Sequence, residues 1–287
     1  MKKSISYVPF NKGNFDRFGE SKFEKIKEAG FSCVDYSICN TDIFLYNAPF
    51  DEAKEYMLKE KDLAFKAGIK IEQMHGPWRF PPRDFEDADR AERMEKMKRS
   101  IRLASLLDCK NWVVHPIMPF GIEDKGTGNE EKTYEFNISF MKDLLVTAKE
   151  CGVTICLENM PFKDFTISTP DEILRVVNEI NDDNFKICLD TGHVVCINEE
   201  TPADAVRKLG DKISALHVHD TRAFHDDHTM PYFGVINWKD FGKALNEIGF
   251  EGGFSWEITL GSKFSDKTFM STAKLLSDIA GEIIECK

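Results

Sequence analysis

The chain has 287 residues, of which 42% are hydrophobic and 11% aromatic, enough for one large core. Its formal net charge of −11 opposes attraction to phosphate polyanions, so nucleic acid is not an expected partner. The first residues lack the apolar core of a signal peptide, and no run approaches the roughly 18 apolar residues of a membrane span. We therefore expect a cytoplasmic protein that contacts no membrane.

Short β-rich runs alternate with longer amphipathic segments along the chain. The runs predict strands at residues 4–8, 33–38, 70–74, 112–115, 153–157, 186–190, 214–219 and 253–257. Between them, segments such as 53–68 and 92–108 space apolar residues three and four apart, as helices do. About eight βα units predict a single-domain (β/α)8 barrel over residues 1–287. A doubly wound open sheet is the alternative, but no glycine-rich phosphate-binding turn follows the first strand.

Local signals support these boundaries. Gly30, Gly68, Gly152 and Gly249 each lie between a helical segment and the next strand, where a glycine can adopt positive φ. The sequences TPDEIL and TPADAV each place a threonine cap before a proline and acidic residues, as at a helix start. The eight cysteines form no CxxC pair, which predicts reduced, space-filling thiols.

Acidic residues end three of the predicted strands. Glu158 follows ICL, Asp190 ends ICLD and Glu257 follows FSW. An isolated buried carboxylate is costly unless it is paired or binds a metal. Any one of them can instead cap a helix or pair with Lys or Arg. Because the carboxyl ends of barrel strands share one opening, three such acids together indicate a site.

Six of the seven histidines lie at strand ends or in the loop after the seventh strand. In the sequence HVH, alternation places His217 and His219 on one face of a strand, directed at the barrel mouth. A single histidine is more often a satisfied core residue. Imidazole combined with carboxylate suits a divalent transition metal such as zinc, manganese or cobalt.

Seven motifs in order resemble the xylose isomerase-like superfamily of TIM barrels, which joins sugar isomerases and epimerases to endonuclease IV-type apurinic endonucleases. The motifs are HGP, VVHP, LEN, LDTGH, HVHD, DDH followed by FGVINW, and SWE, between residues 70 and 257. The resemblance implies a shared metal site with ligands Glu158, Asp190, His217 and Glu257. His75, His115, His193, Asp226 and His228 match further zinc ligands of the endonuclease branch. In sugar-handling members His193 faces the substrate, while the family does not settle the role of His219.

The loops after the strands differ from those of the endonuclease branch. They read GPWRFPP after His75 and PIMPFGIEDKGTGNE after His115, rich in aromatic and acidic residues and poor in the cations that would bind a nucleic-acid backbone. Trp78, Phe80, Phe120 and Trp238 are candidates to line a sugar pocket, although ordinary packing explains each alone equally well.

The resemblance implies a sugar or sugar-phosphate isomerase or epimerase with one or more divalent ions (Mn, Zn or Co), and homo-oligomers occur in the family. Such an ion would stabilise the enediolate formed when a carbon beside a carbonyl loses its proton. Glu158 and Glu257 would then act as the acid/base pair. The alternatives are an apurinic endonuclease or phosphoesterase, a keto-sugar lyase or dehydratase, and a sugar-binding barrel without catalysis.

Overall fold

The computed structural model describes residues 1–8, 17–82, 84–261 and 263–286. Its strands are β1 (Lys2–Ser6), β2 (Cys33–Asp35), β3 (Lys70–His75), β4 (Asn111–Val114), β5 (Thr154–Glu158), β6 (Phe185–Asp190), β7 (Ile213–His217) and β8 (Gly253–Trp256). They form one parallel sheet in the order β7-β6-β5-β4-β3-β2-β1-β8. The sheet closes between its edges, where Val218 forms a parallel bridge with Trp256. The predicted (β/α)8 barrel is confirmed.

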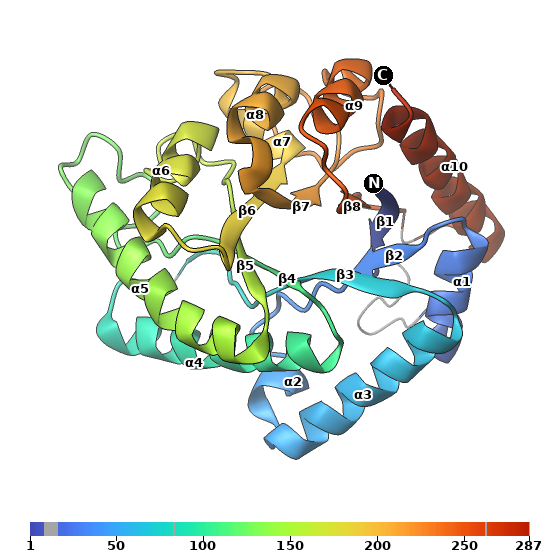
Figure 1. Ribbon diagram of the computed structural model, residues 1–287, viewed down its shortest axis with the longest axis horizontal. Coiled ribbons are helices and arrows are strands. Elements are labelled where there is room, and N and C mark those ends of the chain that lie inside the picture. Colours follow the sequence, from blue (N-terminus) through green and yellow to red (C-terminus); the bar gives the residue numbers. More distant parts are fainter. Residues whose placement is uncertain (9–16, 83, 262, 287) are drawn as a thin grey trace.

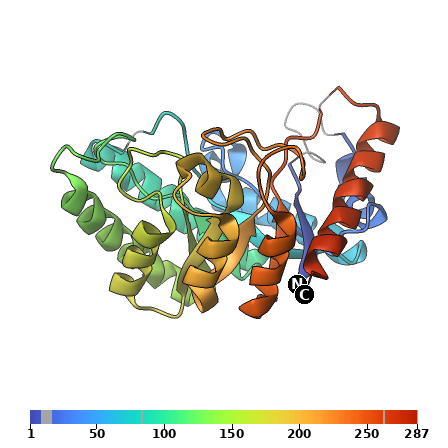
Figure 2. The same ribbon diagram turned by 90° about the horizontal axis from the view of Figure 1, so that it is seen from above.

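Helices surround the strands on the outside of this barrel (Figure 1). They are α1 (Lys22–Glu28), α2 (Phe44–Asn47), α3 (Phe50–Lys66), α4 (Asp87–Leu106), α5 (Glu130–Cys151), α6 (Pro170–Ile180), α7 (Thr191–Ile197), α8 (Pro202–Leu209), α9 (Trp238–Glu247) and α10 (Asp266–Ile284), with short 3-10 helices at Gly19–Ser21 and Gly210–Lys212. Figure 2 shows both termini at one end of the barrel. That is the end where β1 begins, so the strands run toward the opposite end.

The helix boundaries follow the sequence signals. Thr169 accepts a hydrogen bond from the backbone N–H of Glu172, and the Glu172 side chain accepts one from Thr169, which forms a capping box at the start of α6. Thr201 caps α8 in a similar way. Gly152 ends α5 with φ 64°, a conformation that glycine adopts without strain. The cap of α6 marks the end of the loop after β5, and Gly152 marks the turn from α5 into β5.

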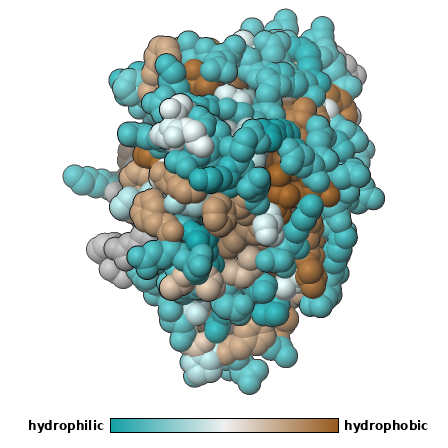
Figure 3. Space-filling view, turned by 90° about the vertical axis from the view of Figure 1, so that its left-hand side faces the viewer, coloured by the Kyte–Doolittle hydropathy of each residue, from teal (hydrophilic) through white to brown (hydrophobic). Residues whose placement is uncertain are grey.

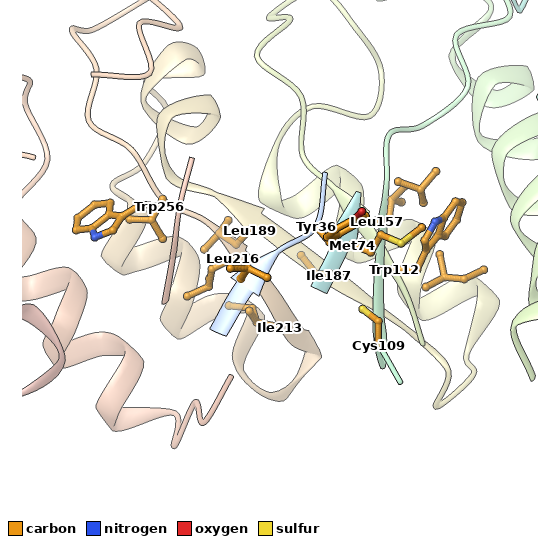
Figure 4. Packing of buried hydrophobic residues seen from close by; sticks show 14 of the residues in the cluster. Tyr36, Met74, Cys109, Trp112, Leu157, Ile187, Leu189, Ile213, Leu216 and Trp256 are labelled. Carbon is orange, nitrogen blue, oxygen red and sulfur yellow. The ribbon is translucent and has the colours of Figure 1, made fainter. Parts of the chain in front are cut away.

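The two faces of the strands pack differently. Side chains that face outward are large and pack against the helices, as Figure 4 shows for Trp112 and Trp256. The Trp112 indole donates to Ser100 of α4, and the Trp256 indole donates to the Leu276 carbonyl of α10. Inside the barrel lies a separate cluster of small buried residues, Val113, Cys156, Cys188 and Ala215. We call this cluster the inner layer, because it forms the floor beneath the site described below.

The surface seen in Figure 3 is mainly hydrophilic, with hydrophobic residues in separate patches. No helix in the described part of the chain is long and apolar enough to cross a membrane. All eight cysteines lie within the described residues and carry free thiols. Burial raises the pKa of Cys33 to about 11 and that of Cys156 to about 12, which keeps both thiols protonated near neutral pH.

Candidate active site

Four side chains converge directly above the inner layer. Residues two apart on a strand share a face. Each of Cys156, Cys188 and Ala215 is therefore followed, two positions on, by an inward-facing site residue: Glu158, Asp190 and His217 respectively. Glu257 follows β8, and its N–H donates to the Val218 carbonyl across the closure of the barrel. Ligand atoms of Glu158, Asp190, His217 and Glu257 all lie within 4.8 Å of one another. We call these four residues the inner cluster.

The inner cluster has the chemistry of a cation site. His217 Nδ1 lies 2.8 Å from Glu158 Oε1 and 3.3 Å from Glu257 Oε2. Asp190 Oδ1 accepts from the N–H of His193 at the start of α7, which leaves Asp190 Oδ2 buried without a hydrogen-bond partner. Within the described residues, these three carboxylates form ion pairs with histidines and with no Lys or Arg. Buried acids in this state are stabilised by a shared metal ion, so the residues fit a divalent cation.

Two more histidines contact Glu158 from β3 and the end of β4. His75 Nε2 lies 3.3 Å and His115 Nε2 lies 3.0 Å from Glu158 Oε2. His75 Nδ1 lies 2.8 Å from the Gly76 carbonyl, and its Nε2 faces the site, where it also lies 3.1 Å from His115 Nε2. Burial lowers the pKa of His115 to about 4, which keeps that imidazole neutral. Burial alone would raise the pKa of Glu158, but His217 and His115 lower it well below its usual value. Glu158 is therefore an ionised carboxylate that can bridge two groups of ligands.

A second group lies nearer the surface of the barrel mouth. It consists of His193, His219, Asp226 and His228, which we call the outer cluster. Asp226 lies at its centre, 3.6 Å from His193 Nε2, 3.6 Å from His219 Nε2 and 3.3 Å from His228 Nε2. Although burial opposes protonation, Asp190 and Asp226 raise the pKa of His193 to about 9, and Asp226 and Glu257 raise the pKa of His228 to about 10.

The fold directs the Nε2 atoms of all three outer imidazoles toward Asp226. In each ring the other nitrogen, Nδ1, faces a backbone carbonyl: Asn159 at 2.6 Å from His193, Asp220 at 3.3 Å from His219 and Glu257 at 2.8 Å from His228. Gly192 makes room for this arrangement, because a Cβ there would lie 1.9 Å from the His219 ring. Metal-binding histidines are commonly held by such a hydrogen bond on the second nitrogen. The outer cluster therefore also has the features of a metal site.

A cavity of about 290 Å³ opens beside both clusters. Glu158, Glu257, His193 and His228 are among the polar residues on its wall. The wall also includes the aromatic residues Trp78, Phe80 and Phe162, with stacked rings of Phe80 and Phe162 whose centroids lie 5.9 Å apart. The cavity thus combines ionisable groups with aromatic rings, a combination suited to a small polyol with one apolar face.

The profile of the xylose isomerase-like TIM barrel family matches residues 23–276. The chain belongs to this family. A D-psicose 3-epimerase of Enterocloster bolteae is 27% identical over 263 residues, covering 88% of this chain and 80% of the relative. An uncharacterised protein of Methanocaldococcus jannaschii is 31% identical, covering 83% of this chain and 78% of the relative. The crystal structure of a D-tagatose 3-epimerase-like protein superposes with a TM-score of 0.76 and 26% identity, covering 99% of this chain and 98% of that one.

The structure corrects two expectations about the pocket of this family member. Trp238 does not line the cavity: it is buried at the start of α9, where its indole donates to Asp220 and packs against Trp256. Phe120 is 38% exposed and packs against Phe136, away from the cavity wall. His219, whose role the family resemblance left open, is fully buried, does not line the cavity and belongs to the outer cluster.

Sequence reasoning also missed residues that the fold brings to the site. Phe162, Ser37 and Cys39 line the cavity, but none stands in a pattern that distinguishes it from ordinary loop residues. Asp35 lies inside the strand predicted at residues 33–38, whereas in the structure it ends β2 just as Asp190 ends β6. Its strand-end position is therefore visible only in the structure. Asp35 is buried, and its Oδ2 lies 2.9 Å from His217 Nε2.

Proposed function

We propose that the chain is a divalent-metal-dependent sugar epimerase or isomerase. The observation that carries the proposal is the position of Glu158 and Glu257, which share the inner cluster and both lie on the wall of one cavity. The similarity to a D-psicose 3-epimerase over 88% of the chain supports proton transfer on a ketose. The family match supports the same class of reaction.

The two glutamates have the properties that stepwise proton transfer requires. One removes the proton from the carbon beside the substrate carbonyl, and the other returns a proton to the opposite face or to the adjacent carbon. Return to the opposite face gives an epimer, and return to the adjacent carbon gives an aldose or ketose isomer. A divalent cation held by the inner cluster would supply stabilisation of negative charge on the substrate oxygens. Glu257, whose side chain is 27% exposed, is better placed to exchange its proton with solvent than Glu158 at 1%.

The substrate side of the cavity suits a monosaccharide. His193 lines the cavity, where its ring can contact a sugar hydroxyl, and Trp78 packs edge-on against His115 with centroids 4.4 Å apart. Trp78, Phe80 and Phe162 can cover the apolar face of the ring. Three arginines are candidate phosphate ligands: Arg79, Arg83 and Arg222. Arg222 pairs with Asp227 of its own loop, Arg79 pairs with Asp89 and Glu92, and neither is on the cavity wall, while Arg83 lies outside the described residues. We therefore favour an unphosphorylated sugar.

The test is turnover in D2O. Purified protein of measured metal content is incubated with a panel of ketoses, their C3 epimers and their phosphates, and products are analysed by NMR. We expect an epimer or isomer that carries solvent deuterium at the reacting carbon, and loss of turnover after chelation that added Mn²⁺ or Co²⁺ restores. A dehydrated product would instead establish a lyase. Binding of sugars without any turnover would contradict an enzymatic function.

The histidines around Glu158 and Asp226 favour one second candidate, a phosphoesterase of the apurinic endonuclease type. His75, His115, His193, Asp226 and His228 can hold cations beyond the one in the inner cluster, and zinc clusters activate water for phosphate ester hydrolysis. The net charge of −11 disfavours a nucleic-acid substrate. Incision of a duplex containing an abasic site by the zinc-loaded protein would reverse our ranking.

A further inference from the structure

A buried carboxylate contacts His217 on the side of the ring that faces away from the inner cluster. Asp35 ends β2, across the barrel from β7, and is 1% exposed. Its Oδ2 lies 2.9 Å from His217 Nε2, while His217 Nδ1 faces Glu158 and Glu257. The imidazole is thus held between two sets of acids, of which only one belongs to the inner cluster.

Gln73 of β3 fixes the orientation of Asp35. Its amide nitrogen donates to Asp35 Oδ2 at 3.1 Å and to the Leu216 carbonyl at 3.0 Å. Its amide oxygen accepts from the N–H of Leu216 at 3.4 Å. Both ends of the amide are therefore engaged with the backbone of the residue that precedes His217. The chain of contacts links β2, β3 and β7 inside the barrel, and it leaves Asp35 little freedom to turn away.

The contact with Asp35 determines which nitrogen of His217 is available to a cation. An ionised carboxylate only accepts hydrogen bonds, so the His217 nitrogen beside Asp35 must carry the proton. The other nitrogen, Nδ1, lies 2.8 Å from Glu158 Oε1 in the inner cluster. A cation bound there would replace the proton on Nδ1, while Asp35 retains the one on Nε2. A carboxylate that holds a histidine in this way fixes its tautomer and orientation and increases its strength as a ligand.

Asp35 also adds negative charge beneath the cation site. Its Oδ1 is buried without a hydrogen-bond partner. In the described part of the chain the ion-pair partner of Asp35 is His217, and no Lys or Arg pairs with it. A buried carboxylate in this state is stabilised by positive charge nearby, so it favours occupancy of the inner cluster.

We propose that Asp35, held by Gln73, is a positioning residue that sets His217 for metal binding through Nδ1. The inference rests on the proposed function only in assuming that the inner cluster binds a divalent cation. It does not depend on which sugar is the substrate. Asp35 does not line the cavity, so its effect reaches the reaction through His217.

The test is the affinity of the metal-stripped protein for Mn²⁺ and Co²⁺, measured by calorimetry and by the visible spectrum of bound Co²⁺. The binding step of the inner cluster is identified as the one lost in Glu257→Gln. In Asp35→Asn we expect that step to weaken by about 10- to 100-fold and the Co²⁺ spectrum to change. Gln73→Leu, which frees Asp35 without removing it, should produce a smaller loss in the same direction.

Asp124→Asn is the matched control, because Asp124 is equally buried but accepts from Thr166 and Thr133 in another part of the barrel. Thermal melting of each metal-stripped variant monitors folding. Wild-type affinity in Asp35→Asn, or an equal loss in Asp124→Asn, would overturn the proposal. So would a wild-type protein that binds neither ion. A protein that shows the expected metal affinities but turns over no sugar would disprove the proposed function and leave the role of Asp35 intact.

Discussion

The inner and outer clusters share one barrel mouth but are positioned by different parts of the fold. Every inner residue ends a strand or directly follows one, and Glu158, Asp190 and His217 are almost completely buried. The outer cluster takes Asp226 and His228 from the loop between β7 and α9, where their side chains are 32% and 29% exposed. The sheet therefore fixes the first cluster, whereas the second depends on how one loop folds.

This difference suggests a division of roles. Residues on rigid strands are suited to a reaction that needs accurate geometry, and residues on loops are suited to tuning what enters the site. We therefore expect changes in the inner cluster to abolish turnover, and changes in the outer cluster to alter metal content with a smaller effect on turnover. The following predictions test that division.

The largest effect is expected for the two glutamates. Glu158→Gln and Glu257→Gln should each lower kcat by about 10²- to 10⁴-fold, because the amide can neither accept nor return the proton. Steady-state kinetics and deuterium exchange into the substrate measure the loss. Glu251→Gln, an exposed position just before β8, is the control and should behave as wild type. Full activity with bound metal in either site variant would refute the acid/base assignment.

Disruption of the outer cluster should remove a metal ion and spare the reaction. We expect the double variant Asp226→Asn, His228→Ala to lose about one equivalent of zinc by elemental analysis, since two of the four outer ligands are gone. The kcat value should stay within about tenfold of wild type, well above that of the glutamate variants. Loss of turnover as complete as in Glu257→Gln would show that the two clusters act as a single catalytic unit.

The two clusters should also differ in how metal binding depends on pH. In the metal-free protein the pKa of His193 is raised to about 9 and that of His228 to about 10, so both are protonated at neutral pH. A cation must displace both protons, so outer-cluster affinity should rise with pH between 6 and 8, by up to about 100-fold per unit. The inner cluster has one imidazole, so its metal affinity should rise by at most about tenfold per pH unit. Zinc titrations at several pH values measure both slopes, and equal slopes would contradict the distinction.

The same division explains what the sequence could predict. Strand-end acids are a local pattern, so the sequence alone indicates that Glu158, Asp190 and Glu257 share one candidate site. The choice of His217 as the fourth ligand depends on the family resemblance, because strand alternation treats His217 and His219 alike. Trp238 could not be assigned correctly, because only the fold shows that the loop before it returns to the core and buries its indole on Asp220. The alternation in HVH predicts the same orientation for His217 and His219. In the structure β7 ends at His217, and His219, two residues later, lies beside Asp226 in the outer cluster. The conformation of a loop depends on long-range contacts, and these produce no repeating pattern of residues in the sequence.

Asp220 provides the contact that links the loop of the outer cluster to the barrel. Its buried carboxylate accepts from the N–H groups of Thr221, Tyr232 and Ile236 and from the Trp238 indole. These donors bracket the segment that carries Asp226 and His228. Asp220 Oδ2 accepts the hydrogen bonds from Tyr232 and Trp238, and Oδ1 accepts those from Thr221 and Ile236. An asparagine has only one side-chain oxygen, so one of these pairs of donors would lose its acceptor.

Asp220→Asn should therefore weaken the outer cluster without touching its ligands. We expect the free energy of unfolding to fall by about 2 to 3 kcal/mol, the usual cost of losing hydrogen bonds to a buried charge. The affinity of the outer cluster for zinc should fall about tenfold. The metal affinity of the inner cluster should be unchanged, because none of the hydrogen-bond donors to Asp220 belongs to that cluster. Asp124→Asn controls for the general loss of a buried carboxylate. If both clusters weakened equally in Asp220→Asn but not in the control, the loop would be supporting the inner cluster too, and the sheet alone would not be sufficient to position it.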